Sequence, residues 1–547
     1  MAIVAATPLL AADWAVLGLY LALLLGTGVW FSRRAARTTD EYFRGTRAMP
    51  PWAVAISILA TAQSAATFVG VPQSAFAGDL TYLSSNLGGL IAAVVLAVFF
   101  IPAFYRLGVA TPYGLLETRF GPGARLAASC AYLIGRVLAS GARVFVGALP
   151  ACLALFGDTL PSHMAIVIAA FIAFGIAYTF IGGVSSVIWT DVIQVAVYLG
   201  AALATIAVLL ARIPAPIGEI LSALATPPDG GPSKLTVLRI GLDPSRPGLG
   251  FDPSQEFTLL TVVTGFVLLT LASHGMDQDL VQRMLTCRDA RRGARSVIGG
   301  VLVGVPAVAI FLCVGLLLWV YYARPDIMGA AAPAYAPDSG QAFQTFALRE
   351  MRGGLAGLFL AGLFAAGPAG INSGLNSMSS TFVGDIYRHA RPGRDDRHYL
   401  AVGRAGVVGA GLLMGGFALL SIWWFGRGDT KLLPFVLGVM GFAYAGLLGV
   451  FLTALFTRRG STRSVVASLI TGFLVVLALE PLVWREWTAL SPWTADNLRP
   501  IVIAFPWRLV IGAAAAFAVC CLGARRPDPH PSATLTPTLA PTPEVTP

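Results

Sequence analysis

The stretch "LAGLFAAGPAGINSGLNSMSSTFVGDIY" (360–387) has two properties that work against each other in a membrane helix. Its first half is apolar enough to lie in lipid, but Gly367-Pro368 weakens the helix and polar side chains follow from Asn372 to Ser380. Polar groups in lipid are costly unless they face the protein interior or a water-filled cavity. We therefore expect a membrane helix whose weak, polar part lines a functional site.

The rest of the sequence indicates many such helices. Of its 547 residues, 56% are hydrophobic and 12% are charged, against about 45–50% and about 25% in soluble chains. Apolar runs long enough to cross a hydrocarbon core of about 30 Å recur throughout. We predict an all-α polytopic membrane protein with about thirteen spans, at 14–32, 51–73, 81–105, 123–152, 161–182, 186–211, 256–282, 295–322, 353–381, 401–426, 432–456, 463–484 and 505–523.

The positive charge is concentrated in the connections after spans 1, 3, 7, 9, 11 and 13. Because Lys and Arg favour the cytoplasmic side, we predict an extracellular N-terminus (1–13) and a disordered, Pro/Thr-rich cytoplasmic tail (524–547) in the cell membrane. The net charge of +10 then faces anionic membrane lipid, and no nucleic-acid partner is needed. No phosphate-binding loop or nucleophile–base motif is recognisable, so we expect neither a pump nor an enzyme, and we infer no obligate protein partner.

Polar residues inside spans 2 and 4 are the first functional candidates. In span 2, packing explains a Ser or Thr better than it explains Gln63. Span 4 carries Arg136 and Arg143 on nearly the same face. A guanidinium at mid-depth needs a carboxylate, carbonyls, a cavity or a ligand. We expect Arg136 to be structural, whereas Arg143 belongs either to a structural ion pair or to a substrate site.

Spans 6 and 7 add charged candidates. Asp191 enters span 6 among polar neighbours, which favours a cation or proton site over a residue at the membrane surface. In span 7, Ser273-His274-Gly275 is predicted to interrupt the helix, and the Asp and Arg residues that follow are expected to form structural pairs.

Five stretches together resemble the sodium:solute symporter family. They are "DEYFRGTRAMPPWAVAISILATAQSAATFVGVPQSAFAG" (40–78), "IGGVSSVIWTDVIQ" (181–194), "SHGMDQDLVQRML" (273–285), "GLAGLFLAGLFAAGPAGINSGLNSMSSTFVGDIY" (354–387) and "GLLGVFLTALFTRR" (446–459). The resemblance implies a leucine-transporter-type fold with two inverted repeats of five helices, in which spans 2 and 7 are discontinuous. Its parts would be a first helix and cytoplasmic loop (14–50), the repeats (51–211 and 256–456), an extracellular loop between them (212–255) and two final spans (457–523).

The resemblance also implies site residues. The family's main Na⁺ site would use carbonyls of Ala60, Gln63 and Ala366 with two Ser hydroxyls of span 9, and a second ion position would centre on Asp191. Substrate would lie among Ser64, Thr67, Asn86 and Arg143, with Ser273 and His274 lining the same pocket. In the sialic-acid-transporting branch, the arginine at the Arg143 position holds a carboxylate, which suits a small organic anion or zwitterion.

Span 9 departs from the family pattern at the ion ligands. Ala369 and Gly370 replace the two Ser residues, and Asn372 replaces an aspartate. Losing oxygen ligands weakens a site for a hard cation. The Phe364 carbonyl that Pro368 frees, together with the side chains of Asn372, Ser64 or Thr67, is one predicted compensation. Ser373 is a further candidate cation ligand.

The sequence therefore predicts a secondary active transporter that moves a small organic solute by alternating access, with Na⁺ symport as the default coupling. One alternative keeps the fold but makes transport independent of Na⁺ or coupled to protons through Asp191. A second alternative is a transporter-like membrane sensor.

Overall fold

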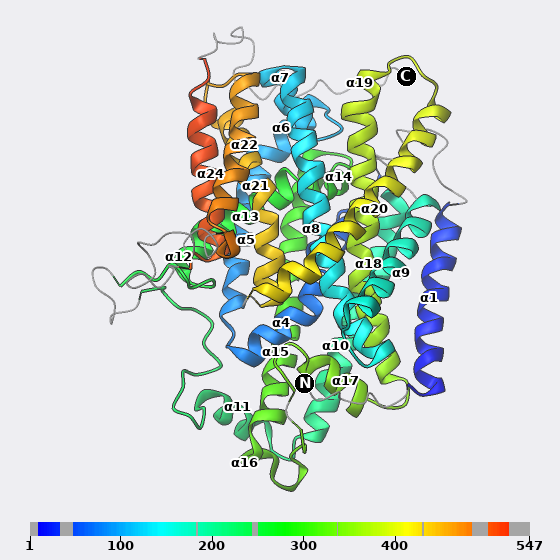
Figure 1. Ribbon diagram of the computed structural model, residues 1–547, viewed down its shortest axis with the longest axis vertical. Helices are drawn as coiled ribbons and strands as arrows, with labels where there is room; N and C mark the ends of the chain where they lie inside the picture. The colour runs from blue at the N-terminus through cyan, green and yellow to red at the C-terminus, as the bar shows by residue number, and fades with distance from the viewer. Residues whose placement is uncertain are drawn as a thin grey trace, which may run out of the picture.

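The computed structural model describes residues 9–32, 48–181, 184–242, 250–335, 337–428, 431–483 and 502–524. Within these ranges the chain is a bundle of helices, and a single isolated β-bridge joins Leu242 to Phe251. Figure 1 shows long helices running along the vertical axis, with the short helices α11, α16 and α17 at one end and α7 and α19 at the other. The prediction of an all-α, polytopic membrane protein is confirmed.

Nine helical segments of the described ranges are long and apolar enough to cross a membrane, and counting two bent pairs as one span each gives eleven. Two shorter apolar helices, α22 (Thr462–Ala478) and α24 (Phe505–Cys521), lie at the last two predicted spans, and the total of thirteen stays a prediction. The nine segments are α1 (Ala11–Ser32), η1 to α6 (Thr81–Leu107), α8 (Pro122–Phe156), α9 (Pro161–Ile181), α10 (Val184–Arg212), α15 (Ala290–Ala323), α18 to α19 (Leu355–Ala390), α20 (Asp396–Arg427) and α21 (Leu432–Phe456).

Shorter elements complete these segments and their connections. The third span consists of η1 (Thr81–Ser84), α5 (Ser85–Val95), η2 (Leu96–Phe100) and α6 (Ile101–Leu107). The span that begins with α18 (Leu355–Thr381) continues as η5 (Phe382–Tyr387) and α19 (Arg388–Ala390). The connecting helices are α7 (Tyr113–Phe120), α11 (Ile217–Ala225), α16 (Pro325–Met328), η4 (Gly329–Ala331) and α17 (Ala342–Glu350).

The first interrupted helix is formed by α3 (Pro51–Ala62) and α4 (Ala65–Ala77), which meet at a bend of 65°. Gln63 and Ser64 have extended backbone, and Ser64 caps α4 in a reciprocal capping box with Thr67. A capping box satisfies N–H groups that a helix start would otherwise leave unpaired. The polar cluster of span 2 therefore stabilises a break inside the membrane.

The second interrupted helix has almost the same geometry. Its first half runs through α12 (Leu259–Thr261), η3 (Val262–Phe266) and α13 (Val267–Gly275), and its second half is α14 (Gln278–Met284), at a bend of 64°. The Asp277 carboxylate caps α14 by accepting a hydrogen bond from the backbone of Asp279 (3.0 Å). The break follows Ser273-His274-Gly275, where the sequence predicts it.

Helix α18 runs unbroken past Gly367-Pro368, where the sequence indicates a weak point. Proline is tolerated inside membrane helices where neighbouring helices support the backbone. Here a Cβ placed on Gly367 would lie 3.6 Å from the ring of Phe171 on α9, and the Gly367 backbone also approaches Gly147 on α8. Neighbouring helices thus lie within van der Waals reach of α18 beside the proline.

The first interrupted helix is also fixed from outside the break. A Cβ placed on Gly315 of α15 would lie 2.2 Å from the carbonyl oxygen of Pro72, so α15 and α4 cross with almost no side-chain spacing. At the far end of α4, Lys234 Nζ donates hydrogen bonds to the carbonyls of Phe76 and Gly78 (2.9 Å each). Burial lowers the pKa of Lys234 to about 8. The connection after α11 is thereby tied to α4.

Candidate functional site

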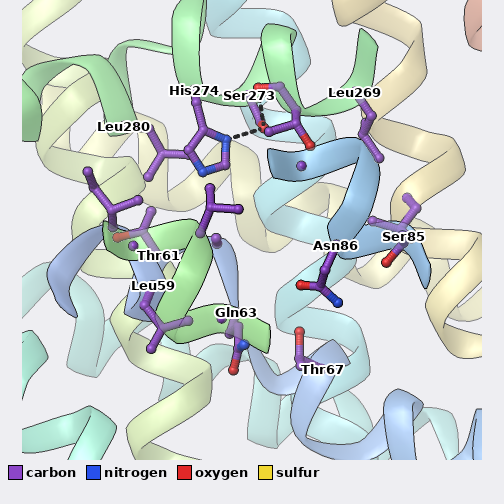
Figure 2. Close-up of a pocket in the computed structure, with 18 of the residues that line it drawn as sticks. Leu59, Thr61, Gln63, Thr67, Ser85, Asn86, Leu269, Ser273, His274 and Leu280 are labelled. Carbon is purple, nitrogen blue, oxygen red and sulfur yellow. Dashed lines mark hydrogen bonds between the residues drawn. The ribbon is translucent and has the colours of Figure 1, made fainter. Parts of the chain in front are cut away.

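A cavity of about 170 Å³ lies between the two interrupted helices. Figure 2 shows side chains entering it from above and below. The polar lining residues are Thr61, Gln63, Thr67, Tyr82, Ser85, Asn86, Arg136, Arg143, Thr270, Ser273, His274 and Tyr444, and Leu59, Val308 and Met440 are among the apolar ones.

Five of the six predicted substrate residues line this cavity: Thr67, Asn86, Arg143, Ser273 and His274. In Figure 2 the Thr67 hydroxyl points towards the Asn86 carboxamide, and the His274 ring lies against Ser273 on the other side. His274 Nδ1 is 2.9 Å from Ser273 Oγ. The structure therefore brings together residues from α4, α5, α8 and α13.

The sixth predicted substrate residue, Ser64, is not part of the lining because it caps α4, accepting a hydrogen bond from the backbone of Ala66 (3.3 Å). Its neighbour Gln63 does line the cavity, and Gln63 Oε1 accepts a hydrogen bond from the Tyr198 hydroxyl (3.1 Å). Ser64 thus shapes the site through the backbone.

Arg143 has weak contacts for a charged group inside a membrane protein. Its Nη1 donates to the carbonyl of Thr61 at 3.4 Å, its Nη2 lies 3.5 Å from the sulfur of Met440, and its Nε has no hydrogen-bond partner. No carboxylate of the described residues pairs with it. Of the two roles that the sequence leaves open, a structural ion pair finds no support in these contacts.

Arg136, seven residues earlier on α8, is in the opposite situation. Its Nη1 lies 3.0 Å from Asp277 Oδ2, and its Nη2 pairs with Asp279. Tyr444 on α21 donates to the same oxygen of Asp277 at 2.7 Å. These groups are buried, so the expected structural role of Arg136 fits its contacts.

The pairs continue into what we call the ion-pair network: Arg136, Asp191, Asp277, Asp279 and Arg283. Arg283 Nη1 lies 2.6 Å from Asp279, and its Nη2 lies 3.1 Å from Asp191. Ser57 on α3 donates to Asp191 at 2.5 Å. Asp191 is therefore buried within the protein and is engaged by an arginine. Its role as a cation or proton site stays a prediction.

The remaining predicted cation residues are not drawn into one cluster by their contacts. Ala60 and Ala366 are buried. Because α3 ends at Ala62, the carbonyls that follow Leu59 have no helical N–H partner, whereas the Leu59 carbonyl accepts from Gln63. Asn372 contacts Thr179 on α9 (3.5 Å), and Ser373 donates to Asp279 on α14. These contacts turn both side chains towards α9 and α14.

One substituted position of span 9, Gly370, has open space beside it. A Cβ placed on Gly370 would meet no atom within 4 Å. The side chains of Pro368 and Ala369 lie outside the described residues, so the compensation through Pro368 stays a prediction. Among the described residues, no group of three or more His, Cys, Asp or Glu side chains is placed to hold a metal ion.

The sequence reasoning missed several lining residues, including Tyr82, Thr270, Met440 and Tyr444. Thr270 could have been found, because it lies three residues before Ser273 and so shares its helix face. Tyr444 carried a weaker signal, a hydroxyl in an otherwise apolar span. Tyr82 and Met440 carry none that separates them from ordinary packing residues.

The sequence pattern of the sodium:solute symporter family matches residues 42–472, most of the chain. The chain belongs to the sodium:solute symporter family. Membership confirms the predictions of a multi-pass membrane transporter, of Na⁺ as the coupling ion and of a small solute as cargo. Since the family consists of transporters, an enzymatic role has no support from it.

Relatives with assigned functions span different solutes. The chain is 29% identical over 471 residues to the sodium/sialic acid symporter SiaT of Proteus mirabilis (strain HI4320), covering 85% of this chain and 89% of that protein. It is 28% identical over 481 residues to the human sodium/iodide cotransporter, covering 85% and 69%. It is 26% identical over 475 residues to the human sodium-coupled monocarboxylate transporter 1, covering 85% and 72%.

Solved structures agree with the family fold. A Na⁺-coupled sialic acid symporter in a substrate-bound, outward-open state matches with a TM-score of 0.76 and 26% identity, over 93% of this chain and 97% of that one. Mhp1, a nucleobase-cation-symport-1 family transporter, matches with a TM-score of 0.50 and 18% identity, over 88% and 93%, and supports the fold alone.

Proposed function

We propose that the protein is a Na⁺-coupled symporter of a small organic anion and that Arg143 binds the carboxylate of this solute. The observation that carries the proposal is the contrast on α8: Arg136 pairs with two carboxylates, whereas Arg143 lines the cavity with none. A part-buried guanidinium that touches no carboxylate keeps N–H donors free for a ligand. A bound carboxylate would supply the counter-charge and can accept two parallel N–H donors from a guanidinium.

The other walls of the cavity fit a small, partly apolar anion. Leu59 and Val308 offer apolar contacts, while Asn86 and Ser273 add neutral polar groups. Two relatives act on carboxylate-bearing solutes by name, sialic acid and monocarboxylates. We propose Na⁺ binding at the α3 break, where helix-end carbonyls provide the oxygen ligands that a hard cation requires.

We also propose an extracellular N-terminus and a cytoplasmic C-terminus. The Lys- and Arg-rich connections support this orientation. Helix α1 begins at the end of the bundle that carries α11, α16 and α17 (Figure 1), so the N-terminus and the predicted extracellular loop with α11 share one side. A cysteine introduced into α11 should react with an impermeant reagent added outside intact cells. Reaction only after permeabilisation would show the opposite orientation.

A thermal-shift screen tests the solute class. Purified protein is mixed with small carboxylic acids and with their primary amides, in Na⁺ and in choline buffer. We expect an acid to stabilise the protein, its amide to have no effect, and the shift to require Na⁺. Equal stabilisation by acid and amide would refute the carboxylate site.

Transport of the best acid into proteoliposomes is then measured with a Na⁺ gradient. Arg143→Gln should abolish uptake and Arg143→Lys should weaken it, because lysine keeps the charge but loses the planar fork. Arg292→Gln, at an exposed arginine, is the control and should not change uptake. Equal uptake in Na⁺ and choline would favour the Na⁺-independent transporter, and binding without uptake or counterflow would favour the sensor.

A further inference from the structure

An apolar groove of about 350 Å³ lies on the outer face of the bundle, between α8, α21 and α22. Small residues create it: Ala127, Ala131 and Gly135 follow each other at four-residue intervals on α8, so one face lacks side-chain volume. At Gly135 an added Cβ would lie 2.0 Å from the Ala443 side chain of α21. At Gly123 an added Cβ would lie 2.7 Å from the first residue of α22, Thr462. The groove lies between these two points of helix contact.

The groove is separate from the central cavity and opens outward. Cys130 and Ile134 of α8, together with Val466, Ile470 and Leu474 of α22, line it and are exposed. In a membrane-spanning bundle, such a face meets lipid. From Ala127 to Leu138 the groove follows twelve residues of α8. Their eleven steps of 1.5 Å give about 16 Å, or about half of a hydrocarbon core. This length suits an acyl chain from one leaflet.

A positive charge marks one end of the groove. Arg463 is exposed in the first turn of α22, three residues before Val466 and seven before Ile470, on the same helix face. It forms no ion pair within the described part of the chain. The positive end of the α22 dipole lies beside it and also favours an anion. Nearby, Arg459 donates one N–H to the carbonyl of Cys521 (3.3 Å). A carbonyl is neutral, so this contact leaves the positive charge of Arg459 in place.

We propose that this groove binds an anionic phospholipid, with one acyl chain along Ala131 and Ile470 and the phosphate on Arg463. The apolar groove fits the acyl chain, and the guanidinium complements the headgroup charge.

The site is connected to transport through its helices. On α21, Phe442 and Ala443 line the groove while Met440 and Tyr444 line the central cavity, and α8 likewise presents Gly135 to one and Arg136 to the other. Bound lipid would therefore brace the wall that carries Arg143.

The test compares phosphatidylglycerol with phosphatidylcholine of identical acyl chains, added to the detergent-purified full chain. Binding is measured by native mass spectrometry and by the shift in melting temperature. We expect phosphatidylglycerol to bind more tightly. Arg463→Gln should weaken its binding about fivefold, which corresponds to about 1 kcal/mol per arginine near an anionic headgroup, and should leave phosphatidylcholine binding unchanged.

Matched controls separate this site from general charge attraction. Arg291→Gln changes another exposed arginine at the second residue of a helix, α15, and should have no effect. Ile470→Trp fills the groove and should reduce binding of both lipids, whereas Leu412→Trp on the exposed face of α20 should not. Equal losses in the two arginine variants, or normal binding in Ile470→Trp, would overturn the proposal. Because all four positions are exposed, the variants should fold, and melting without added lipid checks this.

Discussion

The two interrupted helices bend by 65° and 64°, but their chemistry is different. The α3/α4 break is closed by neutral groups: Gln63, the Ser64 hydroxyl and Thr67. At the α13/α14 break, Asp277 caps α14, and α14 itself carries Asp279 and Arg283. Equal geometry therefore supports two different kinds of contact inside the membrane.

The difference separates ligand contacts from structural ones. Around the neutral break, the polar groups make single, partly long hydrogen bonds and several of them face the central cavity. Around the charged break, every carboxylate is held by an arginine, and the ion-pair network connects α14 to α8 and α10. We infer that the neutral break serves binding and that the charged break anchors the second half of its helix.

The largest expected effect comes from breaking the charged side. Arg136→Ala leaves Asp277 with one hydroxyl and one backbone N–H as partners but no cation, and leaves Asp279 with one arginine, in a buried setting. We expect a loss of about 3–5 kcal/mol in the free energy of unfolding. Arg292→Ala, which removes an exposed pair with Asp289 at 3.5 Å, should cost at most about 1 kcal/mol. Chemical unfolding in detergent measures both, and similar losses would contradict an anchoring network.

A pH experiment examines Lys234, whose ammonium group binds the carbonyls at the end of α4. Burial lowers the pKa of Lys234 to about 8, from about 10.4 in an unfolded chain. Between these values the unfolded chain holds the proton and the folded chain does not, so stability should rise with pH in that window. The rise should reach about 3 kcal/mol at most. Melting curves from pH 7.5 to 10.5 should show it in the wild type and not in Lys234→Met; parallel curves would contradict the assignment.

Crowding of α4 gives the next largest effect. Gly315→Ala places a methyl group 2.2 Å from the Pro72 carbonyl and should cost about 1–3 kcal/mol through overpacking. Gly304→Ala on the same helix is the matched variant, because its nearest neighbour is 3.6 Å away on Leu59. It should keep the melting temperature but lower solute affinity, since Gly304 lines the cavity. Equal loss of stability in both variants would show that α15 is not closely fitted to α4.

The smallest effect should come from the cap of the neutral break. Ser64→Ala removes the capping hydroxyl of α4 and should cost about 1 kcal/mol. Ser461→Ala removes the same kind of capping box from α22, away from the cavity. The two variants should lose similar stability, but only Ser64→Ala should lower Na⁺-driven uptake. Equal uptake in both would mean that the α4 cap has no part in binding.

The sequence could predict the local features of this molecule. Spans follow from apolar runs, and both breaks lie where polar residues weaken a span, at Gln63-Ser64 and after Gly275. An arginine in the middle of a span, such as Arg143, is informative because a charge at membrane depth must be paired or must face a cavity or a ligand. These inferences need only the chemistry of neighbouring residues and the membrane.

Partners distant in sequence could not be predicted in this way. Arg136 meets Asp277 across 141 residues, and Asn372 faces Thr179 across 193. Which residues meet depends on how α8, α9, α14 and α18 pack, and helix periodicity gives a face without naming its neighbour. Helix α18 likewise continues past Pro368 beside Phe171 of α9, a neighbour that the local sequence does not name.

The charges around the cavity also have an electrical consequence. The ion-pair network holds three aspartates and two arginines, and the charge of Arg143 beside it brings the sum to zero. The conformational change of the empty carrier then moves no net charge from this group of residues, and over a full cycle the charge that crosses the membrane equals the charge of the cargo. One Na⁺ with one monovalent anion would move no charge. A second Na⁺ would move one, and the resting potential would add about 2.3 kcal/mol per 100 mV to accumulation.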